Sequence, residues 1–276
     1  QSFALHENIY LRTRRSGDFM AVQYAPRLGS STWQLYPEFL AAADWPRDRW
    51  TPVRIEVAGS RLAIFVGEGD SPKIVVPRLR SGSPGGGVAL WARVNNRPDA
   101  WAAAVSNFTA GPAATAAPLL APQPPPAEFI QRWSVAGPYP EDAPAPPPDA
   151  AWRTLEAEES GLVNLSRVFP PQPRKRLVAF ARKTLVSDAA RRVRLGVGYS
   201  DQVEVRLDGA PVYAAVNGWE SRHPGYTGFV DTRFEHAMLP LKAGRNELVF
   251  AVTDDQAFGW GFAARLASLD GLTLES

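Results

Sequence analysis

The first residues that could do chemistry form a polar cluster near the beginning of the sequence. Segment 8–13 alternates with period two, which would place Tyr10 and Arg12 on one face of a strand with Asn8 and His6 in line. On such a face, planar polar groups could hydrogen-bond sugar hydroxyls while an aromatic ring stacks on the apolar face of a sugar. With two side chains expected on neighbouring strands, the candidate saccharide contacts are His6, Glu7, Tyr10, Arg12, Gln23 and Trp33. If the face is instead buried, Tyr10 belongs to the core and Arg12 pairs with an acid.

A second cluster lies in segment 218–228, which is punctuated by glycine and proline. Loops at the end of a β-sandwich are where binding residues collect. The candidate contacts with a glycan or a partner surface in this loop are Trp219, Arg222, His223 and Tyr226. The alternative is a long connection whose aromatic side chains cap the sandwich.

Two adjacent carboxylates, Asp254 and Asp255, follow an expected strand. Calcium takes several oxygen ligands, commonly including backbone carbonyls, so a structural calcium site is one interpretation of this pair. A turn that the aspartates hold by side-chain hydrogen bonds is the other. The sequence indicates no further cofactor.

The signatures of several enzyme classes are absent from the sequence. A retaining glycosidase needs two carboxyl groups about 5–5.5 Å apart, but Glu7 and Glu56 each stand alone on their expected strands. Any catalytic pair would therefore come from separate strands. The chain has no cysteine, which excludes disulfides, thiolate zinc sites and thiol nucleophiles. Segment 81–85 departs from the nucleophile-elbow pattern at Pro84.

Composition points to a globular β protein. The 276 residues have a formal net charge of +2 and no long basic run, so we expect no nucleic-acid binding. No apolar run approaches the roughly 20 residues needed to span a bilayer. Nine Trp, 22 Gly and 26 Pro suit strands joined by tight turns. Gln1 is not an initiator methionine, so we expect a processed or trimmed chain.

Alternating segments and turns divide the chain into two β-rich parts. Residues 110–127 are rich in Pro and Ala, which favours an extended linker. We therefore expect an all-β fold with two sandwich domains, at 1–110 and 128–276, joined by a linker at 111–127. Expected hairpins lie at 51–66 and at 202–213, the latter turning at Asp208 and Gly209. Further strands are expected at 33–36, 87–92 and 101–108, and one short helix at 151–159.

The first part resembles a concanavalin A-like domain of the laminin-G or glucanase type. The resemblance rests on segments 7–12, 23–26 and 33–36, and on the hairpin that begins at Trp50 and continues to Val66. It implies a lectin-like sandwich. The segment is shorter than such sandwiches usually are, so we expect either first strands upstream of Gln1 or a reduced domain.

The second part is similar to the galactose-binding jelly roll that precedes the barrel of β-galactosidase-type glycoside hydrolases. The matching segments are 198–209, which ends in Asp-Gly, and 239–248, which contains a Leu-x-x-Gly-x-Asn-type turn. The resemblance implies a jelly-roll sandwich associated with sugars. Many such domains are structural companions that bind no sugar.

These observations favour a non-catalytic carbohydrate-binding or accessory protein of a bacterial glycan-processing system, secreted or periplasmic. Its expected partner is an oligo- or polysaccharide. One alternative is a glycoside-active enzyme, a hydrolase or lyase, whose carboxylates converge from separate strands or from the cleft between domains. The other is an adaptor that binds a protein through its aromatic loops. The sequence does not indicate an oligomeric state.

Overall fold

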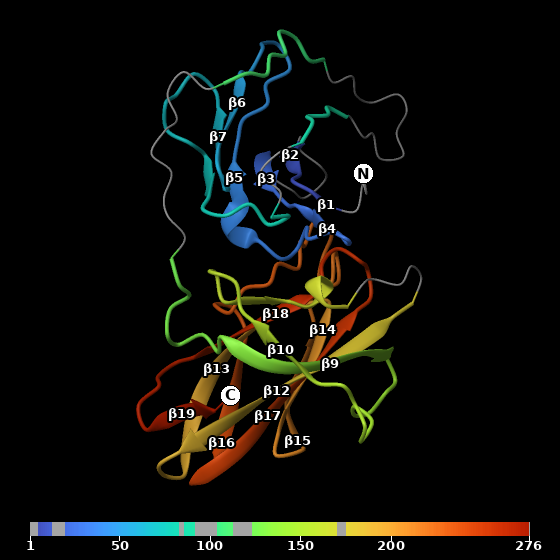
Figure 1. Ribbon diagram of the computed structural model, residues 1–276, viewed down its shortest axis with the longest axis vertical. Helices are drawn as coiled ribbons and strands as arrows, with labels where there is room; N and C mark the ends of the chain where they lie inside the picture. Colours follow the sequence, from blue (N-terminus) through green and yellow to red (C-terminus); the bar gives the residue numbers. More distant parts are fainter. Residues whose placement is uncertain are drawn as a thin grey trace.

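The computed structural model of the chain describes residues 5–12, 20–82, 86–91, 104–112, 123–169 and 175–275. Within these ranges the fold is all-β, as the sequence predicted, and the paired strands are antiparallel. The helical elements of the described ranges are two single 3₁₀ turns, η1 (Pro37–Phe39) and η2 (Leu165–Arg167). Figure 1 shows two parts stacked along the long axis, the N-terminal part above the C-terminal part.

The C-terminal part is a sandwich of two sheets. The larger sheet has the order β10-β9-β12-β17-β14-β15, with β19 also paired to β12. Its strands are β9 (Arg132–Pro140), β10 (Arg153–Glu156), β12 (Leu177–Ser187), β14 (Gln202–Leu207), β15 (Ala210–Val216), β17 (Gly244–Asp254) and β19 (Leu272–Glu275). The smaller sheet has the order β11-β18-β13-β16. Its strands are β11 (Leu162–Asn164), β13 (Arg191–Ser200), β16 (His236–Leu241) and β18 (Gly261–Leu266).

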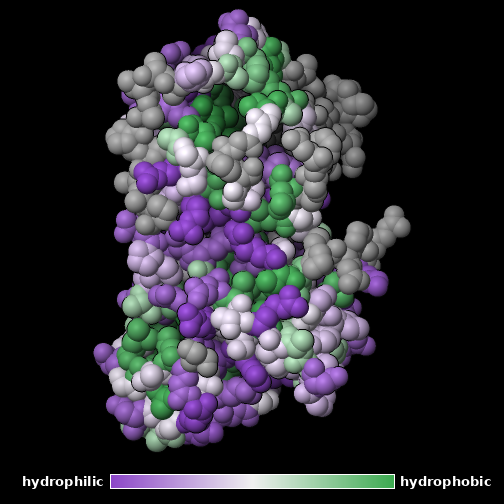
Figure 2. All heavy atoms as spheres, in the orientation of Figure 1, coloured by the Kyte–Doolittle hydropathy of each residue, from purple (hydrophilic) through white to green (hydrophobic). Residues whose placement is uncertain are grey.

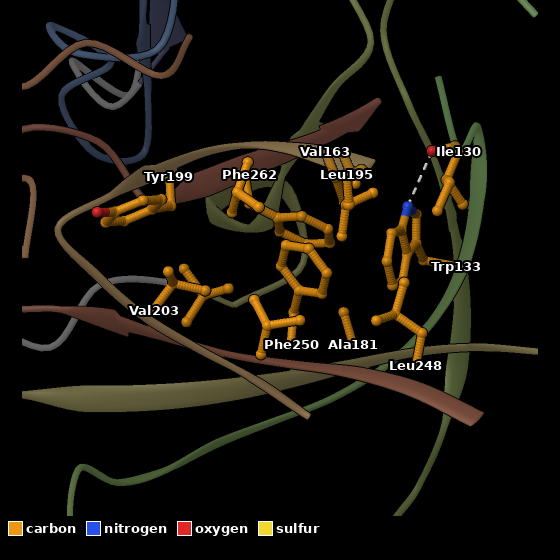
Figure 3. Packing of buried hydrophobic residues seen from close by; sticks show 14 of the residues in the cluster. Ile130, Trp133, Val163, Ala181, Leu195, Tyr199, Val203, Leu248, Phe250 and Phe262 are labelled. Carbon is orange, nitrogen blue, oxygen red and sulfur yellow. Dashed lines mark hydrogen bonds between the residues drawn. The ribbon is translucent and has the colours of Figure 1, made fainter. Parts of the chain in front are cut away.

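Large aromatic side chains fill the space between these two sheets (Figure 3). The rings of Phe250 on β17 and Phe262 on β18 lie 5.1 Å apart, so they join the two sheets directly. Trp133 packs edge-on against both, at 5.1 Å and 4.9 Å, and donates its indole N–H to the carbonyl of Ile130 at 2.9 Å. Burying an indole without such an acceptor would be costly.

The period-two patterns explain the strands of this sandwich. On β14 the buried Val203, Val205 and Leu207 alternate with partly exposed polar side chains, so one face meets the core. The strand turns at Asp208 and Gly209, which both have positive φ (50° and 83°). Positive φ at two successive residues is the geometry of a tight hairpin turn. The predicted hairpin of β14 and β15 is therefore confirmed.

The N-terminal part consists of three small antiparallel sheets with the pairings β1-β4, β2-β3-β5 and β6-β7-β8. Its strands are β1 (Leu5–His6), β2 (Ile9–Arg12), β3 (Ala21–Tyr24), β4 (Arg27–Leu28), β5 (Leu40–Ala42), β6 (Val53–Ala58), β7 (Arg61–Val66) and β8 (Ile74–Val76). The hairpin of β6 and β7 matches the expected one. Val53, Ile55 and Val57 on β6 are 36%, 47% and 51% exposed, and Figure 2 shows apolar surface in this region.

The two parts share a hydrophobic core. Leu162, Val230 and Ala263 of the C-terminal part belong to the same buried cluster as Leu35 and Tyr36 of the N-terminal part. The division of the chain at 111–127 stays a prediction, but the shared cluster packs the parts against each other over buried side chains. Each Å² of apolar surface buried at this junction stabilises the folded chain by about 25 cal/mol.

Gln34 is the polar centre of that junction. Its side chain is fully buried and donates to the carbonyl of Thr227 at 3.0 Å. Its amide oxygen accepts from the hydroxyl of Ser200 at 2.9 Å. Its backbone donates to the carbonyl of Phe258 at 3.0 Å and accepts from the N–H of Val230 at 2.9 Å. One residue of the N-terminal part is thus hydrogen-bonded to four residues of the other part.

Four predicted elements differ in the structure. Segment 33–36 forms a turn, and the region expected to be helical contains strand β10. Residues 86–91 and 104–108 contain no strand; the exposed fractions of Val88 and Val105 are 71% and 67%. The remaining residues of those two predicted strands lie outside the described ranges. Alternation predicts a strand only where a partner pairs with its backbone, and these segments have no ladder.

Candidate functional site

Trp33 is held in place by two buried residues of the N-terminal sheet. Gln23 on β3 donates its side-chain N–H to the carbonyl of Trp33 at 2.8 Å. Arg12 on β2 donates to the amide oxygen of Gln23 at 3.0 Å, and its guanidinium lies 4.5 Å from the Trp33 ring centroid. Both residues are buried, Gln23 completely. The structure therefore places them where they position Trp33 from behind.

Tyr10 lies beside Trp33, as period-two spacing on β2 implies. The two rings meet edge-on with centroids 4.9 Å apart. The hydroxyl of Tyr10 accepts a hydrogen bond from the side chain of Asn8 at 2.7 Å. Four of the predicted residues of this cluster, Tyr10, Arg12, Gln23 and Trp33, are thus brought together.

The second predicted cluster meets the first through Trp219. The rings of Trp33 and Trp219 are 6.2 Å apart, and Phe258 lies 6.1 Å beyond Trp219. Trp33 and Trp219 are half-buried, and Phe258 is 39% exposed. We call Tyr10, Trp33, Trp219 and Phe258 the aromatic ridge. The sequence analysis did not single out Phe258.

Gln256 fixes the backbone that carries Trp219. The N–H of Trp219 donates to the side-chain oxygen of Gln256 at 2.6 Å, and the amide of Gln256 donates back to the carbonyl of Trp219 at 3.2 Å. These reciprocal bonds join the loop after β15 to the turn after β17. Since the same turn carries Phe258, the two rings are positioned by one piece of backbone.

The other predicted loop residues gather around Glu235, which lies just before β16. Arg222 forms an ion pair with Glu235 and also donates to the carbonyl of Val216 at 3.3 Å. The carboxylate of Glu235 accepts from the hydroxyl of Tyr199 at 2.5 Å and from that of Tyr213. Burial, together with the hydrogen bond to Tyr213, raises the pKa of Tyr199 above its ordinary value. This network anchors the outer end of the loop.

His223 and Tyr226 meet edge-on beside Arg222 on the exposed side of the loop. Their rings are 5.3 Å apart, and the Arg222 guanidinium lies 5.1 Å from the Tyr226 ring. The hydroxyl of Tyr226 donates to the side-chain oxygen of Asn217, and the amide of Asn217 donates to the carbonyls of Tyr199 and Phe229 at 2.7 Å and 3.1 Å. The loop is therefore a folded element with polar groups at its surface.

Glu7 and His6 lie apart from the ridge residues. Glu7 accepts from the hydroxyl of Tyr24 at 2.5 Å and from the backbone and hydroxyl of Ser81 at 2.9 Å and 2.5 Å. These bonds tie the segment after β8 to β3 inside the N-terminal part. His6 lies on β1 opposite Arg27, in a different sheet from β2 and β3.

The aspartates of the predicted calcium site are engaged with different partners. Asp254 accepts from the N–H of Ala257 at 3.1 Å, whereas Asp255 is ion-paired with Arg176 at 2.8 Å. Asp201, which is buried, accepts from the N–H groups of Asp255 and Gln256 at 2.8 Å and 2.7 Å. Burial, and next the charge of Asp201, raises the pKa of Asp254 to about 6. These contacts stabilise a turn, and calcium binding stays a prediction.

Across the described ranges, no group of three or more His, Cys, Asp or Glu side chains is arranged to hold a metal ion. No helix in these ranges is long and apolar enough to cross a membrane.

A buried arginine at the junction was not anticipated. The side chain of Arg80 is 3% exposed, lies 3.4 Å from Glu158 and is hydrogen-bonded to Glu159. Its guanidinium also lies 5.4 Å from the ring of Tyr36. Burial would raise the pKa of Glu159, but the hydrogen bond from Arg80 lowers it below the ordinary value. The sequence carries no signal for this contact, since the partners are far apart in the chain.

Comparisons with known proteins identify no family for the chain. No protein-family model matches it, and no curated protein matches it. Among solved structures, a β-glucosidase from Kluyveromyces marxianus in complex with glucose is 12% identical with a TM-score of 0.35, over 50% of this chain and 16% of that one. A family 35 carbohydrate-binding module from an environmental isolate is 14% identical with a TM-score of 0.26, over 54% and 92%.

A third similar structure is a GH2 β-galacturonidase from Eisenbergiella tayi bound to glycerol. It is 15% identical with a TM-score of 0.32, over 50% of this chain and 23% of that one. This chain thus spans about a sixth of the β-glucosidase and under a quarter of the galacturonidase. Likenesses with such TM-scores carry no argument about function. The concanavalin A-like resemblance of residues 1–110 stays a prediction.

Proposed function

We propose that the chain is a non-catalytic carbohydrate-binding or accessory protein of a bacterial glycan-processing system, and that its saccharide lies across the aromatic ridge. The observation that carries this proposal is the meeting of Trp33 and Trp219 at the surface of the junction. Indole rings offer broad, rigid apolar surface at a low cost in conformational entropy. The apolar C–H face of a pyranose is complementary to such a surface.

Polar groups beside the ridge suit the hydroxyls of the same ligand. Arg222 and His223 are exposed on the loop that carries Trp219, and Gln256 is exposed on the turn that carries Phe258. Ligand sites commonly combine an apolar wall with a few placed polar groups. Here the wall comes from both parts of the chain, and the described polar groups come from the C-terminal part.

The acids on these loops are engaged with protein partners, which supports binding over cleavage. Glu235 accepts from two tyrosine hydroxyls and pairs with Arg222. Asp201 and Asp254 accept backbone hydrogen bonds within a turn. A retaining glycosidase would instead present one protonated and one ionised carboxyl to the same glycosidic bond.

The proposal is tested by glycan-array binding combined with analysis of the same glycans for cleavage products. Binding without any product supports it. Release of shortened glycans would favour the glycoside-active alternative. If no glycan on the array binds and the chain captures a defined protein, the adaptor alternative is favoured. A secreted or periplasmic location belongs to the same proposal, because it follows from the class of domain alone.

A further inference from the structure

Lys183 lies at a gap along one edge of β12. The opposite edge of β12 pairs with β17 along its whole length, from Leu177 to Ser187. On the edge in question, β9 pairs with β12 as far as Arg182, and β19 pairs with it from Thr184 onward. Lys183 therefore stands where one neighbouring strand stops and the other begins.

The side chain of Lys183 is directed to the core side of the sheet. Ala181 and Leu185, two residues before and after it, both belong to the hydrophobic core between the sheets. Since side chains two apart on a strand share a face, Lys183 points the same way. Only 7% of the residue is exposed.

The ammonium of Lys183 has no hydrogen-bond or ion-pair partner within the described part of the chain, and it is not sealed from solvent. An ammonium on a largely buried side chain is only partly hydrated, so an anionic partner would compensate its charge. Burial, and next the positive charge of Arg132, lowers the pKa of Lys183 below its ordinary value. An anion bound at this position would therefore favour the charged amine.

The ammonium borders an open pocket of about 300 Å³. Such a volume is at the lower end of small-molecule sites. The pocket is lined by Ala127, Phe129, Gln131, Arg132, Glu156, Lys183 and Leu274. We call it the Lys183 pocket.

The charges of the Lys183 pocket sum to one excess positive charge. Arg132 is bound to Glu156 through two of its nitrogens, at 2.8 Å and 3.2 Å, so among the described residues Lys183 is the lining group without a charged partner. The amide of Gln131 donates to the carbonyl of Pro125 at 3.3 Å, so its oxygen can still accept a hydrogen bond. Phe129 and Leu274 supply apolar wall. One anionic group on a compact ring with hydroxyls fits this combination.

We propose that the Lys183 pocket binds the carboxylate of a uronic acid, with Lys183 as its counter-ion. That the ligand is a sugar rests on the proposed function. That it carries a carboxylate is inferred from the ammonium of Lys183. The pocket shares no residue with the aromatic ridge, so the two sites fail or succeed independently.

The test is isothermal titration of the full chain with sodium glucuronate, with glucose and inorganic phosphate as further probes. Lys183→Met removes the charge while keeping a long unbranched side chain. Lys242→Met is the matched control, because it removes an exposed lysine that pairs with Asp208.

We expect glucuronate to bind more tightly than glucose, and Lys183→Met to weaken it by about tenfold or more, as loss of a charge-assisted hydrogen bond predicts. Lys242→Met should leave glucuronate binding unchanged. Unchanged binding in Lys183→Met, or phosphate binding as tightly as glucuronate, would overturn the proposal. If no glycan on the array binds but glucuronate binding still depends on Lys183, the proposal for the aromatic ridge is refuted and the proposal for the Lys183 pocket stands.

Misfolding of Lys183→Met would not end the test. In the wild-type chain, the NMR titration of the Lys183 Cε resonance should shift to higher pH when glucuronate is saturating, because a bound carboxylate favours the charged amine. A titration midpoint that glucuronate does not move would overturn the proposal in the unmodified protein.

Discussion

The indole of Trp33 packs against that of Trp219 with ring centroids 6.2 Å apart, although one residue follows β4 and the other follows β15. Each ring is supported from its own part of the chain, Trp33 by Gln23 and Trp219 by Gln256. The contact therefore joins two independently supported surfaces. A ligand that covers both rings would bind to the junction rather than to either part alone.

Trp219→Ala is expected to weaken glycan binding by at least about tenfold, because buried aromatic anchors dominate binding energy. Trp33→Ala should have a similar effect, and the double variant should lose less than the sum, since the rings contact one another. Titration calorimetry with a glycan identified on the array measures the affinities of the single and double variants. Trp91→Ala, which removes a ring that is 61% exposed and outside the ridge, is the control. Retained affinity in the double variant would exclude the ridge as the site.

Arg80→Met is expected to destabilise the chain by about 1–3 kcal/mol, because Glu158 and Glu159 lose their buried partner and keep Arg167 and Arg78, which are more exposed. Arg78→Met is the matched control. Arg78 also pairs with Glu159, at 3.1 Å, but its side chain is 61% exposed, so the cost should stay below about 1 kcal/mol. Urea unfolding of the three proteins gives the comparison. Equal losses for the two variants would show that Arg80 does not hold the junction.

Local patterns predicted the elements that depend on neighbouring residues. The alternation of segment 202–207 and the Asp208–Gly209 turn gave a correct hairpin, since both signals lie within it. The face that contains Tyr10 and Arg12 was also recognised from period two. Segments 86–91 and 104–108 failed because alternation does not reveal whether a second strand is present to pair with the first.

Long-range contacts could not be read from the sequence. Trp33 and Trp219 were both singled out, but no pattern indicates that their sheets meet. No feature of the sequence around Arg80 distinguishes it from an exposed arginine, and its ion-pair partners Glu158 and Glu159 lie in a different part of the chain. Lys183 sits in a strand with other charged residues, and its burial depends on where β9 ends and β19 begins.

The stability of the fold is expected to depend on pH through Asp254. Its pKa is raised from 3.8 to about 6 by burial and by Asp201, so between these pH values the folded state holds a proton that the unfolded state releases. Stability from this group is therefore present below about pH 4 and lost as pH rises through about 6. Asp254→Asn keeps the acceptor for Ala257 and removes the charge. It should gain stability over the wild type across this interval, by about 2–3 kcal/mol above pH 7.

Urea unfolding from pH 4 to pH 8 in EDTA measures that difference, with Asp255→Asn as the exposed control. A difference between Asp254→Asn and wild type that stays constant with pH would contradict it. Repeating the wild-type measurement with calcium tests the calcium prediction in the same experiment. A stabilisation by calcium that Asp254→Asn abolishes would support the calcium prediction for this pair.

Gly228→Ala is expected to damage both stability and glycan binding. Gly228 has a positive φ of 64°, and an added Cβ would lie 2.6 Å from the side-chain nitrogen of Gln34 and closer still to the carbonyl oxygen of Asn217. Gln34 cannot move aside, because it is fully buried and bonded to Thr227 and Ser200. The loop that carries Trp219 must shift instead.

Gly244→Ala separates the conformational cost from the steric one. Gly244 also has a positive φ, of 87°, but no atom lies within 4 Å of the added Cβ. Its substitution should cost only the left-handed conformation, about 1–2 kcal/mol, whereas overpacking should add about 1–3 kcal/mol at Gly228. Denaturant unfolding gives the stabilities, and calorimetry gives the affinities. Because only Gly228→Ala displaces the loop, only this substitution should lower the affinity for the glycan. Equal affinities in the two variants would show that the loop is not part of the binding site.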